Sequence, residues 1–392
     1  MVPPSIYFPA GLPAPDEDAR AHGLRVQAML RARIQAAEGW LPFEDWMHAA
    51  LYTPGLGYYS AGSAKLGGPG DFTTAPETGP LFGQVLARQV AQILRAADSA
   101  MVLEFGAGSG ALAASLIPAL SDLGLAVDYC ILELSADLRA RQAERLAPWG
   151  GAVRWLDALP GNFSGCVIAN EVLDAMPAAL LCWNAEGAVE VLGVGLDERP
   201  AAPSPFRWEA RPAPADLADR LAERMPPLPG YRTEINRQAE AWIQHMGQWL
   251  DRGAALLIDY GFPQGEFYHP QRAQGTLMCH FRHHAHDQAL ILAGLQDITT
   301  HVDFTAMADA ALAGGLDVLG YTSQARFLMN AGLAGLIPAP DGDPATRART
   351  LATVNTLASE AEMGELFKVL AIGRGLDGPL LGFARGDRRG RL

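Results

Sequence analysis

Residues 101–110 read MVLEFGAGSG, an apolar run that ends in Glu104 and is followed by three alternating glycines. This pattern predicts a buried strand, a tight loop and a helix that begins at Ala111. Glycine lets the backbone approach a ligand closely, and the free amides of a helix N-terminus attract an anionic group. The loop is therefore a candidate cofactor cradle, made of Gly106, Ala107, Gly108 and Gly110.

Glu104 distinguishes between two cofactors that such a loop could hold. Together with Ala111, the loop also satisfies the dinucleotide fingerprint of NAD enzymes. A carboxylate two residues before the first glycine would repel a pyrophosphate, whereas it suits the ammonium and sulfonium groups of S-adenosylmethionine. We therefore expect S-adenosylmethionine to be the cofactor, and an NAD-linked oxidoreductase is the alternative that Glu104 disfavours.

Two further acidic residues end the next two predicted strands. Glu133 closes the strand over 126–134, where it is placed to accept hydrogen bonds from ribose hydroxyls. Asp157 closes the strand over 152–157, at the position where such folds usually read the adenine amino group. Glu104, Glu133 and Asp157 are thus expected to form one wall of the cofactor site.

The stretch ANEVLDAMP follows a fourth buried strand and supplies the candidate catalytic residues Asn170, Glu171 and Asp174. Residues beyond the carboxyl ends of strands in an open α/β sheet face the ligand crevice. If the methyl acceptor is a guanidinium, a pair of carboxylates binds its fork and localises its charge away from the attacking nitrogen. Alternatively, Asn170 and Glu171 orient a hydroxyl or an amine.

These residues must be positioned by an α/β fold with a mostly parallel sheet, because nearly continuous apolar strands alternate with helices from residue 81 onward. We expect N-terminal helices and a Gly/Pro-rich lid in 1–84 and the cofactor-binding half of the core in 85–184. An inserted subdomain is expected in 185–245, where the alternation gives way to strands typical of antiparallel pairing. Residues 246–392 are expected to complete the core.

Composition narrows the choice of partner. The chain has 392 residues and a net charge of −13, which argues against a nucleic acid and is compatible with a basic protein segment. The four cysteines show no CxxC spacing, and no apolar run is long enough to cross a membrane. We expect a cytoplasmic protein without a signal or transit segment. The stretch CHFRHHAHD at 279–287 is expected to be a solvated or substrate-facing loop and not a metal site.

Several motifs together resemble the MidA-like family of S-adenosylmethionine-dependent methyltransferases, over most of the chain and in the family's order. They include GDFTTAPETG at 70–79, LEFGAGSG at 103–110, ANEVLDAMP at 169–177 and LLIDYG at 256–261. The resemblance implies a class I, Rossmann-like methyltransferase core with helices on both faces of the sheet. It also implies that Gly70, Asp71 and Phe72, with Pro76 and Glu77, belong to a loop that closes over cofactor and substrate.

The same family includes a protein arginine methyltransferase, so the resemblance implies an arginine in a protein substrate. Other arginine methyltransferases also have a Thr-His pair near the loop that carries the catalytic carboxylates, which makes His301 a further candidate catalytic residue. The alternative is a structural histidine whose hydrogen bonds are made inside a sheet. A small-molecule O- or N-methyltransferase and a non-catalytic assembly factor that retains the cofactor stay open. The oligomeric state is not predicted.

Overall fold

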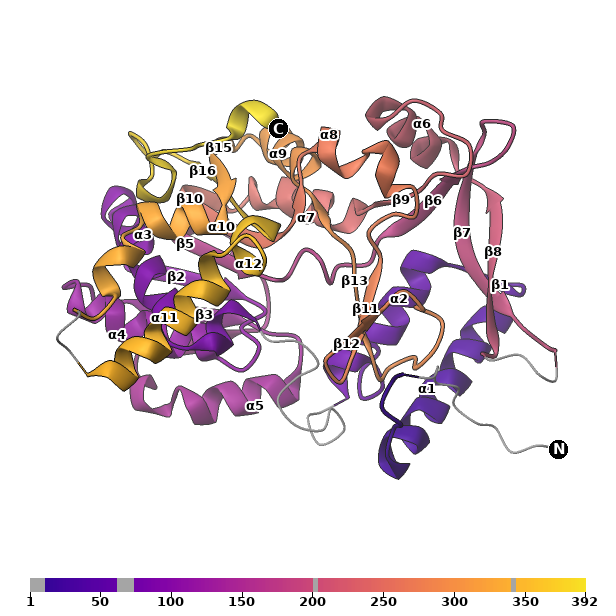
Figure 1. Cartoon of the computed structure of the whole chain (residues 1–392), viewed down its shortest axis with the longest axis horizontal. Helices are drawn as coiled ribbons and strands as arrows, with labels where there is room; N and C mark the ends of the chain where they lie inside the picture. The colour runs from indigo at the N-terminus through magenta and orange to yellow at the C-terminus, as the bar shows by residue number, and fades with distance from the viewer. Residues whose placement is uncertain (1–10, 62–73, 200–203, 340–342) are drawn as a thin grey trace. The chain divides into compact units, whose positions relative to one another are not determined.

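The computed structural model describes residues 11–61, 74–199, 204–339 and 343–392, which form two compact units (Figure 1). The core unit comprises Thr73–Asp174, Ala239–Pro263 and Val302–Leu392. The second unit comprises Met1–Phe72, Ala175–Gln238 and Gln264–His301.

The core unit is built on an eight-stranded sheet with the order β15-β16-β10-β5-β2-β3-β4, and β14 pairs with β10. Strands β4, β3, β2, β5 and β10 run parallel, whereas β16 is antiparallel to both of its neighbours. This confirms the predicted mostly parallel sheet. The strands are β2 (Met101–Phe105), β3 (Asp128–Leu132), β4 (Val153–Leu156), β5 (Phe163–Asn170), β10 (Leu250–Phe262), β14 (Val302–Asp303), β15 (Asp317–Ser323) and β16 (Phe367–Arg374).

Helices cover the sheet on both faces, so its central strands are buried on both sides. In β10, for example, residues 254–258 are all buried, which explains the unbroken apolar run in the sequence. Helix α3 packs against β5 and β10, and α9 packs against β10, β15 and β16 (Figure 1). The helices are α3 (Leu81–Ala97), α4 (Ala111–Asp122), α5 (Ala136–Arg145), α7 (Arg237–Met246), α9 (Phe304–Ala313), α10 (Gln324–Asn330), α11 (Pro344–Ala358) and α12 (Met363–Leu366).

The strand register places the polar strand ends beside one another. Glu104 in β2 pairs with Ile168 in β5, and Asn170 at the end of β5 pairs with Ile258 in β10. The carboxyl ends of β2, β5 and β10 therefore lie at one edge of the sheet, where an open α/β fold binds its ligand.

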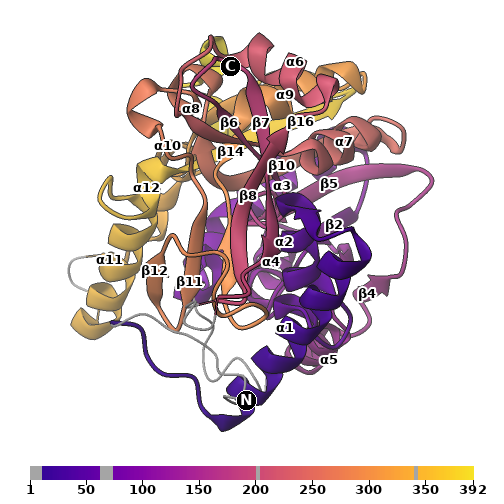
Figure 2. The same cartoon turned by 90° about the vertical axis from the view of Figure 1, so that its right-hand side faces the viewer.

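The second unit is mainly antiparallel. One sheet joins β1, β6, β7, β8 and β9, with the β7–β8 ribbon visible in both views (Figures 1 and 2), and a smaller sheet joins β11, β12 and β13. Phe43, Trp46 and Leu30 are fully buried in its apolar core. Its elements are α1 (Glu17–Ala36), β1 (Trp40–Pro42), α2 (Phe43–Tyr52), β6 (Ala179–Trp183), β7 (Val189–Leu196), β8 (Phe206–Pro212), α6 (Ala215–Arg224), β9 (Arg232–Ile235), α8 (Gln264–Phe267), β11 (Met278–Phe281), β12 (His284–His286) and β13 (Asp297–Thr299).

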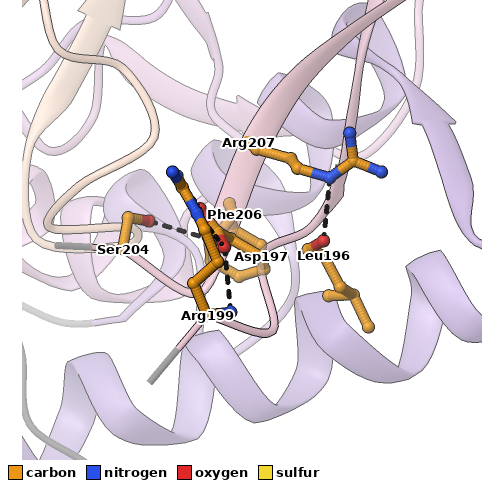
Figure 3. Close-up of polar contacts among 6 residues, drawn as sticks. All are labelled: Leu196, Asp197, Arg199, Ser204, Phe206 and Arg207. Carbon is orange, nitrogen blue, oxygen red and sulfur yellow. Dashed lines mark hydrogen bonds and ion pairs between the residues drawn. The ribbon is translucent and has the colours of Figure 1, made fainter. Parts of the chain in front are cut away.

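Polar contacts hold the facing ends of β7 and β8 (Figure 3). Asp197 accepts hydrogen bonds from the backbone N–H of Arg199 at 3.1 Å and from its Nε at 2.9 Å. On the β8 side, the hydroxyl of Ser204 accepts the N–H of Phe206 at 3.2 Å. Side chains therefore satisfy backbone donors where the strand pairing ends.

The boundaries of the two units differ from the four predicted segments. Antiparallel strands β7 and β8 occur within the predicted insertion at 185–245, but the compact segment begins earlier, at Ala175, because β6 pairs with β7. It ends at Gln238, and most of α7 belongs to the core unit. Residues 264–301, which were expected to belong to the core, fall in the second unit.

Within the described part of the chain, no helix combines the length and apolarity needed to cross a bilayer.

Candidate active site

The glycine loop after β2 has the backbone geometry that its sequence predicts. Gly106, Gly108 and Gly110 have φ angles of 60°, 54° and 81°, in the left-handed region that favours glycine. A Cβ atom built at Gly106 would lie 3.1 Å from Cγ2 of Val172, whereas one built at Gly108 would meet nothing within 4 Å. Open space beside a left-handed glycine is what a backbone cradle for a ligand requires.

Glu104 lies at the end of β2 with only 2% of its surface exposed. The hydroxyl of Tyr129 donates a hydrogen bond to its Oε2 at 2.8 Å. The pKa of Glu104 is raised to about 7, mainly by burial; the hydrogen bond from Tyr129 opposes this rise, and the negative charge of Glu133 adds to it. A cation beside Glu104 would compensate the cost of ionising it, as expected for an acid that receives an ammonium or sulfonium group.

Hydrogen bonds hold the side chain of Glu133 after β3. Its Oε1 accepts the N–H of Ser135 at 2.9 Å, and its Oε2 accepts the side-chain amide of Gln142 at 3.1 Å. Asp157 is different, because its side chain is 86% exposed and forms an ion pair with Arg139 at 2.6 Å. The roles of Glu133 toward ribose and of Asp157 toward adenine stay predictions.

The loop after β5 presents Glu171 in an unusual conformation. Its φ is 55°, a left-handed value that costs free energy for any residue other than glycine, and its N–H donates to the carbonyl of Ile258 at 2.9 Å. Asn170 donates its amide N–H to Oε1 of Glu171 at 3.0 Å. In the part of the chain that the structure describes, the buried Oδ1 of Asn170 accepts no hydrogen bond, so this acceptor is available to a ligand.

Asp174, at the end of this loop, belongs to a cluster of buried acids. The hydroxyl of Tyr260 donates to Oδ2 of Asp174 at 2.5 Å. Asp259, just before Tyr260 in β10, accepts the backbone N–H of Leu173 at 3.0 Å and that of Asp174 at 3.2 Å. Burial, together with the charges of Asp174 and Glu171, raises the pKa of Asp259 well above its usual value. Carboxylates gathered in this way suit a cation with several hydrogen-bond donors.

The core unit thus contains most of the predicted site residues, but His301 belongs to the second unit. There its backbone N–H donates to Oγ1 of Thr276 at 2.9 Å, and the hydroxyl of Thr276 donates to the buried Glu234 at 3.1 Å. Asn170 and Glu171 are in direct contact, and Asp174 is joined to them through the acid cluster. The predicted closing residues Gly70, Asp71 and Phe72 lie outside the described residues.

The neighbouring segment that begins at residue 74 contacts the glycine loop. Glu77, in a short 3-10 helix (Ala75–Thr78), accepts a hydrogen bond from the hydroxyl of Ser109. Arg145 of α5 donates to the same hydroxyl, and its Nη1 lies 3.6 Å from Oε1 of Glu77. A residue expected to belong to the closing segment is therefore in contact with the cradle.

Sequence reasoning missed Asp259 and Gln142. Asp259 carried a readable signal, because it is a polar residue at the end of the apolar run LLIDYG, as Glu104 is in MVLEFG. Gln142 carried a weaker signal: it ends ILELSADLRARQ at 131–142, a stretch that also resembles the family, but a glutamine in an amphipathic helix looks like a surface residue. The structure shows it fully buried.

The histidine-rich stretch forms the hairpin of β11 and β12, with Arg282 and His283 at positive φ in its turn. Burial lowers the pKa of His280 and of His286. Among the residues that the structure describes, no three His, Cys, Asp or Glu side chains are grouped so that they could hold a metal ion.

Comparison with known proteins agrees with this geometry. The model of the family described as "Putative S-adenosyl-L-methionine-dependent methyltransferase" matches residues 85–322. A superfamily member from Burkholderia thailandensis, solved bound to S-adenosyl-homocysteine, is 49% identical, with a TM-score of 0.91 over 97% of this chain and 100% of that chain. The mitochondrial protein arginine methyltransferase NDUFAF7 of Mus musculus is 28% identical over 90% of this chain and 86% of its own length. Its counterpart in Danio rerio is 27% identical, over 86% and 84% respectively.

The cofactor follows from these matches and from the loop itself. Three left-handed glycines, a buried acid at the strand end and a following helix fit the methyl donor S-adenosylmethionine, whose demethylated product is bound in the Burkholderia structure. The chain belongs to this family of S-adenosylmethionine-dependent methyltransferases.

Proposed function

We propose that this protein methylates an arginine side chain in a protein substrate. The observation that carries the proposal is the loop after β5, where Glu171 is held at a φ of 55° beside Asn170 and close to two buried aspartates. A backbone strain that persists at a ligand-facing strand end is typical of a functional position. The arginine methyltransferases that match most of this chain, at 26–28% identity, support the same acceptor.

The acidic loop suits a guanidinium for two reasons. A carboxylate pair accepts several N–H groups of the planar fork and fixes one nitrogen toward the donor. When bound, S-adenosylmethionine supplies the methyl group: a carbon–nitrogen bond forms, the carbon–sulfur bond breaks and its electron pair stays on sulfur. The nitrogen then gives up one proton, and Glu171 accepts it in this proposal. In this proposal, Asn170 and Asp174 orient the acceptor, and a catalytic role for His301 stays a prediction.

The net charge of −13 supports a basic protein segment as the substrate, in preference to a nucleic acid or a membrane surface. The cysteines at 130, 166, 182 and 279 are free, which suits a reducing compartment, and we propose the cytoplasm for this protein. The matching animal relatives are named mitochondrial, so localisation of a tagged protein in its own cell would test this part separately.

The experiment compares wild type with Glu171→Gln, using Glu186→Gln as a matched control on an exposed turn of the second unit. Methyl transfer is followed by mass spectrometry on arginine-containing peptides and on the same peptides with lysine in place of arginine. We expect transfer to arginine alone, a loss of at least about a hundredfold in Glu171→Gln and unchanged affinity for S-adenosylhomocysteine.

Three results would contradict the proposal. Transfer to a small hydroxyl or amine compound and to no peptide would favour a small-molecule enzyme. Tight cofactor binding without transfer to any acceptor would favour a non-catalytic assembly factor. Normal transfer by Glu171→Gln would remove the role given to Glu171.

A further inference from the structure

One face of α5 contacts three segments of the cofactor site: the glycine loop, the end of β3, and β4 with the residue that follows it. Arg139, Gln142 and Arg145 are spaced by three residues and so project from the same side of the helix. Arg139 binds Asp157, and Arg145 binds Ser109 of the glycine loop. Gln142, between them, has no exposed surface.

The side-chain amide of Gln142 has partners on three elements. Its nitrogen donates to the carbonyl of Gly108 at 2.9 Å and to Oε2 of Glu133 at 3.1 Å. Its oxygen accepts the indole N–H of Trp155 in β4 at 2.9 Å. Both amide hydrogens and the carbonyl oxygen are used, so the orientation of the amide is fixed.

We propose that Gln142 is a positioning residue that fixes Glu133 and the glycine loop in register to receive the ribose of S-adenosylmethionine. The proposal rests on the predicted role of Glu133 toward the ribose hydroxyls. A carboxylate that must accept hydrogen bonds from two ribose hydroxyls has to be held in one rotamer. One rigid amide bridges it to Gly108, where the backbone must also approach the cofactor.

No other uncharged side chain of similar size supplies this pair of donors. A methionine keeps the volume but leaves the carbonyl of Gly108 and one oxygen of Glu133 without their donor. A glutamate keeps the acceptor for Trp155 but brings a second carboxylate against Glu133. The charged groups near Glu133 are Glu104 at the end of β2 and Arg139 on α5, and burial already raises the pKa of Glu133.

The first test compares Gln142→Met with wild type by calorimetric titration of S-adenosylhomocysteine and of its 2′,3′-dideoxyribose analogue. Wild type should bind the parent ligand at least about tenfold more tightly than the analogue, since each lost bond involves a charged acceptor. Gln142→Met should lose most of this preference, leaving a difference below about threefold. Its affinity for the analogue should change little.

The outcomes separate the two assignments. If wild type binds S-adenosylhomocysteine and the dideoxyribose analogue equally well, Glu133 does not bind the ribose hydroxyls, and the proposal for Gln142 is wrong as well. If wild type distinguishes them and Gln142→Met does so equally, Gln142 is not the positioning residue. Glu144→Gln, on an exposed part of α5, is the matched control and should behave as wild type.

A second variant has a readout that loss of packing alone would not give. In Gln142→Glu, two carboxylates face each other and share a proton at low pH. Relative to wild type, its affinity for S-adenosylhomocysteine should therefore fall as the pH rises from 6 to 8. A uniform loss across this range would overturn the proposal. If Gln142→Met does not fold, Trp155→Phe removes only the bond that orients the amide and should reduce the ribose preference in part; an unchanged preference would count against Gln142.

Discussion

The carboxylate of Asp259 accepts the backbone N–H of Leu173 at 3.0 Å, and this bond joins the end of β10 to the loop that carries Glu171. The N–H of Asp174 donates to the same oxygen at 3.2 Å. In the described part of the chain, the hydrogen bonds from this loop to Asp259 come from backbone N–H groups, so we expect Asp259 to act through Glu171. Asp259→Ala should lower kcat by about a hundredfold, the cost of misplacing a reacting group by roughly 1 Å, without changing affinity for S-adenosylhomocysteine.

Asp259→Asn distinguishes this anchoring role from a requirement for charge. The asparagine oxygen can still accept both N–H groups, so activity should be closer to wild type than in Asp259→Ala. Hydrogen exchange at Leu173 and Asp174 supplies a measurement that is independent of the acceptor. Faster exchange is expected in Asp259→Ala only. Equal activity and equal exchange in the two variants would contradict the anchoring role.

The left-handed conformation of Glu171 predicts opposite effects on stability and turnover. Glu171→Gly should raise the free energy of unfolding by about 1 kcal/mol, because glycine adopts this conformation without strain. The same change should abolish detectable turnover. Asp98 ends α3 with a φ of 51°, so Asp98→Gly is the matched control, with a similar gain in stability and full activity. Denaturant unfolding and methyl-transfer assays measure both quantities; lower stability in Glu171→Gly would show that the strain argument is wrong.

Several elements of both units could be predicted because their patterns are local. The segments 43–52 and 81–97 have helical periodicity, and the structure contains helices at these bounds. The strand predicted at 165–172 is β5, which spans Phe163–Asn170, and its run at 165–169 is apolar because it is buried. Strands β6 and β9 were not predicted, since each is only a few residues long and is defined by its pairing with a distant partner.

The site was predictable to the extent that its residues stand at strand ends. Glu104 and Glu171 follow apolar runs, and this position alone identified them. The contacts of Gln142 depend on how α5 packs, which the sequence of α5 does not specify. The assignment of 264–301 to the second unit depends in the same way on pairing between distant segments, such as the bridge from Arg232 to Gln274.

A substitution at Gly106 tests directly whether the glycine loop holds the cofactor. Gly106→Ala places a methyl group 3.1 Å from Cγ2 of Val172 at a φ of 60°. We expect a loss of about 1–2 kcal/mol in stability and at least tenfold weaker binding of S-adenosylhomocysteine. Gly161→Ala is the control, because a Cβ atom there would meet nothing within 4 Å. Equal affinities in the two variants would show that the loop does not cradle the cofactor.

The raised pKa of Glu104 predicts how cofactor binding depends on pH. In the folded protein the pKa of Glu104 is about 7, above its usual value of 4.5. Protonation of Glu104 therefore stabilises the fold at low pH, and this contribution is lost as the pH rises through 7. Ligand binding has the opposite sign, because the ammonium group that S-adenosylhomocysteine shares with the cofactor prefers the ionised acid. Affinity for S-adenosylhomocysteine should therefore rise about tenfold from pH 6 to pH 8.

Tyr129→Phe sharpens this prediction, since the hydrogen bond from Tyr129 lowers the pKa of Glu104. Without that bond the pKa of Glu104 rises further, and the midpoint of the affinity profile should move to higher pH. Glu104→Gln should give a profile without this transition. Calorimetric titrations of the three proteins at pH 6, 7 and 8 measure all of these effects. A downward shift in Tyr129→Phe, or a transition that survives in Glu104→Gln, would mean that another group controls the binding of the cofactor.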